Sequence, residues 1–135
     1  MSKFDHILGD KQARSNDVSL DHIDLRAYTW KLVMPDNWHP CDERMSEVRV
    51  RLWNYEINST HSMEIMPYWN VITLATGRRR WYIPFQAVGE FDPSGYDVAI
   101  HINGPSYTNC NIKGEIAYVR ITDQERIAVI RRTNV

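Results

Sequence analysis

The sequence "VRVRLWNYEI", residues 48–57, alternates between apolar and polar side chains and predicts a β-strand with one face in a core. Val48, Val50 and Leu52 share one face of such a strand. The arginines between them share the opposite face with Trp53. The segment therefore predicts a sheet that has one buried side and one side in solvent.

A second segment, "YDVAIHINGP" at residues 96–105, repeats the same period of two. Its apolar positions run from Tyr96 to Ile102, and the Gly104–Pro105 pair ends the run. Further runs of the same kind predict strands at residues 25–34, 69–76, 80–85, 112–121 and 126–132. We expect about seven strands.

These strands predict an all-β fold. The six prolines fall mostly between the runs, and helix is expected at most in a short turn near residues 5–14. We expect a single antiparallel β-sandwich, with a jelly roll as the first choice and an immunoglobulin-like sandwich or another small barrel as alternatives. The residues predicted to lie in or beside the core are Val48, Val50, Leu52, Val98, Ile100, Ile102, Ile116 and Tyr118.

Composition limits the classes of partner. The chain has 135 residues, of which 43% are hydrophobic and 24% charged, as in one folded domain. Sixteen basic and 17 acidic side chains give a net charge of −1. Because no global field draws such a protein to nucleic acid or to a membrane, any contact of this kind must be local.

The first 17 residues form a polar arm, and residues 18–135 form the β-domain. The arm carries three basic and three acidic side chains, which sum to zero charge. We expect it to dock on a neighbouring copy of the chain or on the chain's own surface. No secretion signal or membrane span is recognisable, so we expect a cytoplasmic chain.

The segment "NWHPCDER", residues 37–44, brings His39, Cys41, Asp42 and Glu43 together in a loop. A Cys–His pair is typical of a site for nucleophilic catalysis, and His with carboxylates is typical of a metal site. The spacing matches no recurring metal or catalytic motif, which favours an ordinary loop.

Histidines and cysteines elsewhere give no further chemistry. His101 is expected to face solvent or a cross-strand partner, and neither His61 nor His101 is expected to bind a metal. Cys41 and Cys110 lie far apart and form no C-x-x-C pair, so we expect free buried thiols rather than a disulfide. We expect no cofactor, no bound metal and no enzymatic activity.

Aromatic residues make up 11% of the chain, including five tryptophans. Trp30, Trp53, Trp69 and Trp81 fall in predicted strands, where most of them belong to the core or to a sheet face. Exposed members of this set suit either sugar stacking or an assembly interface that also uses arginine.

The stretch "ATGRRRWYIPF", residues 75–85, predicts the tip of a β-hairpin, with Gly77 at a turn position that needs positive φ. Three arginines at a tip suit a solvated turn, a subunit contact or a phosphate contact. We favour the subunit contact over phosphate binding. The C-terminal strand adds a second basic patch. The candidate interface or RNA-contact residues are Arg78, Arg79, Arg80, Trp81, Arg126, Arg131 and Arg132.

The segment "GYDVAIHINGPSYTNCNIKGEIAYVRI", residues 95–121, resembles jelly-roll coat proteins of small icosahedral RNA viruses. In these proteins a strand that ends in an Asn-Gly type turn is followed by a glycine and an "Ile-Ala-Tyr-Val" type strand. The matching positions are Ile100, Ile102, Asn103, Gly104, Pro105, Gly114, Ile116, Tyr118 and Val119.

The resemblance implies a self-assembling structural protein: a viral capsid or virion-associated subunit, found in the virion or host cytoplasm, whose partners are copies of itself or other coat subunits. The uncharged balance of the arm departs from the basic arms common in small coat proteins, so RNA packaging by the arm is not implied. The alternative function is a carbohydrate- or ligand-binding β-sandwich module.

Overall fold

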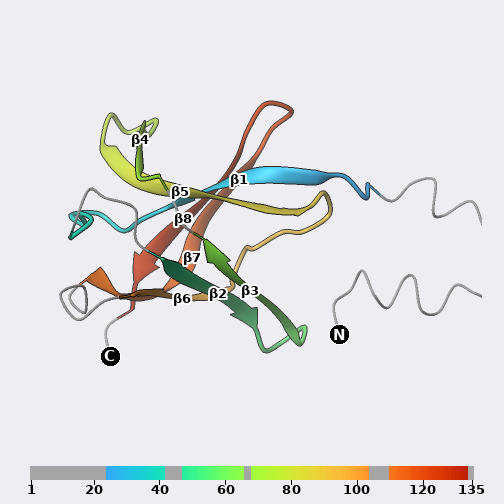
Figure 1. Ribbon diagram of the computed structural model, residues 1–135. Coiled ribbons are helices and arrows are strands. Elements are labelled where there is room, and N and C mark those ends of the chain that lie inside the picture. The colour runs from blue at the N-terminus through green and yellow to red at the C-terminus, as the bar shows by residue number, and fades with distance from the viewer. Residues whose placement is uncertain (1–23, 42–46, 66–67, 104–109, 134–135) are drawn as a thin grey trace, which may run out of the picture.

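The computed structural model describes residues 24–41, 47–65, 68–103 and 110–133. Within these ranges every regular element is a strand, and eight strands form a single mixed sheet (Figure 1). The strands are β1 (Ala27–Val33), β2 (Val48–Asn54), β3 (Ser59–Ile65), β4 (Asn70–Thr73), β5 (Arg79–Val88), β6 (Asp97–Ile102), β7 (Ile112–Ile121) and β8 (Arg126–Arg132). The all-β prediction is confirmed for the described residues, in which no helix fit to cross a membrane occurs.

The spatial order of the strands is β3-β2-β6-β7-β8-β1-β5-β4. Neighbours run antiparallel except β1 and β8, which pair in parallel from Trp30 opposite Arg126 to Val33 opposite Val129. The first and last strands of the chain therefore lie side by side inside the sheet, and the consecutive strands β3 and β4 form its two edges.

This connectivity forces the sheet to curl. Eight strands laid flat span seven inter-strand spacings, roughly 34 Å at about 4.8 Å each. Only four residues, 66–69, separate β3 from β4, and the five Cα steps across them reach at most about 18 Å. Figure 1 accordingly shows β1 and β5 on one side of the molecule and β2, β3 and β6 on the other.

The two halves of the curled sheet share one core. Trp30 of β1 stacks on Phe85 of β5 at 5.9 Å between ring centroids and meets the edge of Phe91 at the same distance. The same cluster takes in side chains from β2, β6, β7 and β8. Seven of the eight predicted core residues are buried: Val48, Val50, Leu52, Val98, Ile100, Ile102 and Ile116.

Tyr118 is the eighth, and its prediction was wrong, because its side chain is 54% exposed. β7 keeps its alternation up to Ile116, which lies opposite Ile130 of β8. The register then shifts, and Tyr118 lies opposite Val129. One extra residue in β7, a β-bulge, turns Tyr118 to the outer face, and a strict period of two cannot foresee it.

The prediction missed β3 altogether. Its sequence, "STHSMEI", is mostly polar, and only Ser59 is buried, since β3 is an edge strand with one neighbour. The predicted arm at residues 1–17 and the short helix near residues 5–14 lie outside the described residues.

Candidate interaction surface

The β4–β5 hairpin carries the arginine run, as the sequence predicts. Gly77 adopts a φ of 85°, the conformation for which glycine is suited. The Leu74 amide donates to the Arg78 carbonyl at 2.9 Å, and the Gly77 amide donates to the Leu74 carbonyl at 2.8 Å. These bonds fix the turn immediately before β5 begins at Arg79.

The three arginines have different surroundings. Arg78 forms an ion pair with Asp36 in the loop after β1. Arg80 is 16% exposed, donates from Nη1 to the Met34 carbonyl at 3.2 Å, and holds Nε 3.5 Å from the Asp36 carboxylate. That second distance is a charge contact, too long for a good hydrogen bond, and Nε has no hydrogen-bond acceptor in the structure. Arg79 is exposed and forms no ion pair with any described residue.

Two of the arginines therefore attach the hairpin to the loop, with Asp36 as their shared counter-charge. The Arg78–Asp36 pair is exposed, and such pairs contribute about 0–1 kcal/mol, so its effect is mainly to position the loop. Arg79 remains as the guanidinium that points to solvent.

A cleft of about 300 Å³ lies between the loop and the hairpin. Residues 35–39 form one wall, residues 79–81 form the other, and Val71 of β4 also lines it. Arginine beside tryptophan is a composition enriched at the centres of protein interfaces.

None of the five tryptophans is exposed. Trp38 is 4% exposed, packs against Trp69 at 4.8 Å between ring centroids, and donates Nε1 to the Cys110 carbonyl at 3.0 Å. Trp81 is half-buried against the core. The large exposed rings are instead tyrosines, with Tyr55 at 77% and Tyr68 at 72%.

The three C-terminal arginines do not form the single patch that the sequence predicts. Arg126 begins β8, and its guanidinium lies 3.6 Å from the ring centre of Tyr28. Arg131 and Arg132 end the same strand, and Arg131 donates from Nε to Glu115 at 3.1 Å. A seven-residue strand spans about 20 Å, which separates Arg126 from the other two.

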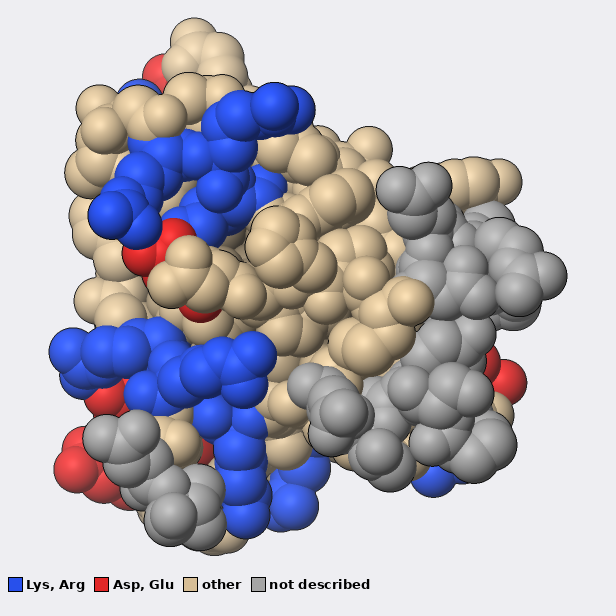
Figure 2. Space-filling model, turned by 90° about the vertical axis from the view of Figure 1, so that its left-hand side faces the viewer, with Lys and Arg blue, Asp and Glu red and all other residues tan. Residues whose placement is uncertain are grey.

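Arg131 and Arg132 instead share one end of the sheet with the arginine hairpin. Val33 of β1 lies opposite both Tyr82 of β5 and Val129 of β8. Past Tyr82, β5 continues toward its N-terminal arginines, and past Val129, β8 continues toward Arg131 and Arg132 at the same end of the sheet. Figure 2 views the molecule from this side and shows Lys and Arg side chains gathered in two bands, with acidic side chains beside them.

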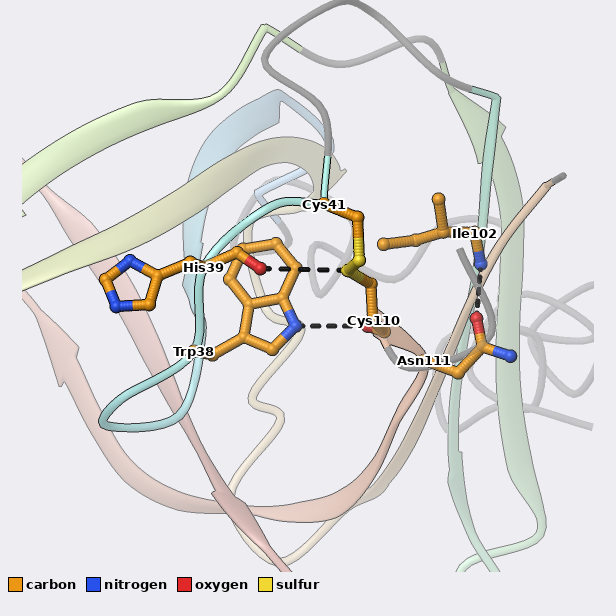
Figure 3. The surroundings of a disulfide bond; sticks show 6 residues. All are labelled: Trp38, His39, Cys41, Ile102, Cys110 and Asn111. Carbon is orange, nitrogen blue, oxygen red and sulfur yellow. Dashed lines mark hydrogen bonds between the residues drawn. A yellow bond between two sulfur atoms is a disulfide. The ribbon is translucent and has the colours of Figure 1, made fainter. Parts of the chain in front are cut away.

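Cys41 and Cys110 form a disulfide, so the prediction of free thiols was wrong (Figure 3). Although they lie 69 positions apart in the sequence, their Cα atoms are 6.1 Å apart. The Cys110 sulfur also lies 3.8 Å from the His39 carbonyl, a packing contact because a disulfide sulfur has no proton to donate. Cys41 thus has no thiol for nucleophilic attack, and the described part of its loop is anchored beside the start of β7.

The predicted histidines are not gathered into a site. His61 of β3 packs 4.4 Å from the ring of Phe91, and burial lowers its pKa. His101 is exposed on the outer face of β6, with Nδ1 3.3 Å from the Asn111 amide nitrogen. Among the described residues no group of three His, Cys, Asp or Glu side chains could hold a metal ion.

No family model, curated protein or solved structure matches this chain. The interaction surface therefore rests on its own geometry. Sequence reasoning found the arginine hairpin but missed Asp36, which follows Pro35 in a loop without a recognisable signal, and missed the exposure of Tyr68 beside β4.

Proposed function

We propose that this chain is a self-assembling structural subunit, and within that class a capsid or virion-associated subunit with a jelly-roll sandwich fold. The observation that carries the proposal is the edge strand β4. It pairs with β5 on one side, and on its other side no described strand pairs with it. Exposed Tyr68 and Val71 accompany it, at 72% and 39%.

Soluble monomers blunt such edges with charge, proline or a covering segment. The ten residues 68–77, "YWNVITLATG", contain neither charge nor proline. Exposed tyrosine and valine rimmed by arginine have the composition of an interface centre. An edge of this kind suits a protein that meets further chains in its working state.

The jelly-roll part of the proposal draws support from two features. The curled sheet packs two inner faces over one core, as a sandwich does. The segment that resembles coat proteins, residues 95–121, corresponds to β6, β7 and the connection between them.

The disulfide bears on where such a subunit would work. Disulfides persist in oxidising compartments and on virion surfaces, and they are rare in the cytosol. A virion location accommodates the Cys41–Cys110 bond better than a permanently cytosolic one.

Size-exclusion chromatography with light scattering, run on the full chain over a range of concentrations, tests the proposal. We expect the full chain to form oligomers or particles, and we expect Tyr68→Ser to weaken this assembly. The matched control is Tyr55→Ser, which removes an equally exposed ring from the β2–β3 hairpin and should leave assembly unchanged.

A strict monomer at every concentration would overturn the proposal. If that monomer also binds on a glycan array and Tyr55→Ser abolishes the binding, the chain is the carbohydrate-binding module of the alternative function.

A further inference from the structure

The hydrogen-bond register shows which backbone groups of β4 face outward. The Met34 amide donates to the Trp81 carbonyl at 2.8 Å, so Trp81 directs its backbone groups toward β1. Successive residues of a strand point their N–H and C=O groups to opposite sides. The residues on either side of Trp81, Arg80 and Tyr82, therefore bond to β4.

Arg80 lies opposite Ile72, and Tyr82 lies opposite Asn70. Asn70 and Ile72 thus use their backbone groups to pair with β5. Val71 and Thr73 direct theirs away from the sheet, where no described strand meets them. The edge offers two donors and two acceptors, spaced two residues apart.

We infer that this edge pairs with the same edge of a second copy, antiparallel and about a two-fold axis through Ile72. This rests on the proposed function and specifies its contact. In this register Val71 of each copy exchanges both backbone hydrogen bonds with Thr73 of the other. Four bonds form, and every outward group of the two residues is satisfied.

The side chains agree with this register. Ile72 lies opposite Arg80, on the face of β4 that points away from the core, and is half-buried; it meets the partner's Ile72, an apolar cross-strand pair. Exposed Val71 meets the partner's Thr73, and both are β-branched residues that suit strands. Because β4 carries no charge, the two-fold brings no like charges opposite one another within the strand pair.

The length of β4 limits the strength of this contact. A stable interface buries about 1,200–2,000 Å² in total, and two four-residue strands with their flanking tyrosines bury less than that. We therefore expect a concentration-dependent dimer, which becomes firm where other contacts add to it in an assembly.

The test compares the full chain with Val71→Lys and Thr73→Pro by sedimentation velocity. Val71→Lys puts a charge on the edge, and Thr73→Pro removes one outward donor without touching a bond to β5. Each should weaken dimerisation about tenfold or more. Ser62→Lys, which places the same charge on the exposed face of the other edge strand, is the control and should leave the dissociation constant unchanged.

Amide exchange by NMR provides a second readout that also checks folding. The amides of Asn70 and Ile72 should be protected at all concentrations, and those of Val71 and Thr73 only where the dimer is populated. The edge contact would be overturned, and self-assembly left standing, by dimers that persist in both variants together with unprotected Val71 and Thr73 amides in the wild-type dimer. A wild-type chain that stays monomeric would overturn both.

Discussion

The two edge strands of the sheet, β3 and β4, differ in the ionisable side chains that they carry. β3 carries Glu64, which forms an ion pair with Arg49 of β2 at 3.1 Å, and the titratable His61. β4 carries no ionisable side chain. Charge on an edge discourages further pairing, so of the two edge strands among the described residues only β3 has this protection.

Pro84 sharpens the difference, because it ends the pairing between β4 and β5. The register of β5 points the Pro84 nitrogen away from β1, toward the place where β4 would continue at Tyr68. Proline has no N–H to donate there. The Tyr68 carbonyl instead accepts from the side-chain amide of Asn70 at 2.9 Å. Thus β4 is short because of one residue on its neighbour.

The largest expected effect concerns the shared core, in which the two sides should be alike. Leu52 of β2, next to β3, and Ile83 of β5, next to β4, are both fully buried. Leu52→Ala and Ile83→Ala should each lower the free energy of unfolding by about 2–5 kcal/mol, measured by chemical denaturation. A loss under about 1 kcal/mol in one of them would show that its side of the sheet is not part of a common core.

The second effect concerns the disulfide, which should act on the β4 side. Replacing both cysteines, as Cys41→Ser with Cys110→Ala, should lower the free energy of unfolding by about 2–4 kcal/mol. Because the bond anchors the loop that carries Asp36, amide exchange should accelerate around Arg78 and not in β3. Equal acceleration on both edges would contradict this link.

A smaller effect is expected from Pro84→Val, which tests why β4 ends where it does. The new N–H should bond the Tyr68 carbonyl and lengthen β4. The gain of a hydrogen bond, about 0.5–1.5 kcal/mol, is offset by the greater freedom of the unfolded chain. We expect stability within about 1 kcal/mol of wild type and a newly protected amide at position 84. An amide there that exchanges as fast as an exposed loop would refute this explanation.

The smallest effect belongs to β3 and depends on pH. Burial lowers the pKa of His61 below its ordinary value of 6.5, so the unfolded chain binds a proton more readily than the folded one. Stability should be complete above about pH 6.5 and decline as the pH falls toward the folded-state pKa. The melting temperature of His61→Phe should decline less between pH 7.5 and 5.5 than that of wild type, and identical profiles would exclude this role.

Alternation predicted the strands that have an apolar face. The bounds of β7 and β8 coincide with the predicted ranges, and the inward residues of β2 and β6 are buried as expected. The sequence did not predict β3, because an edge strand with one neighbour needs few apolar residues. Tyr118 was misplaced because a bulge depends on how two strands pair rather than on the sequence of one.

The candidate site was predicted less well than the fold. The hairpin at Gly77 follows from local turn chemistry, which a short sequence window contains. The Cys41–Cys110 bond, the Asp36 ion pair and the separation of Arg126 from Arg131 depend on strand order. Strand order is a property of the whole chain, and periodicity carries no information about it.

The parallel pairing of β1 with β8 also determines how the domain responds to force. A pull on the two chain ends acts on the start of β1 and the end of β8, which lie at opposite ends of two adjacent strands. Such a load slides the strands along each other, so their hydrogen bonds resist together instead of opening one after another. The fold therefore places a strand pair that is loaded in shear between the two ends of the described chain.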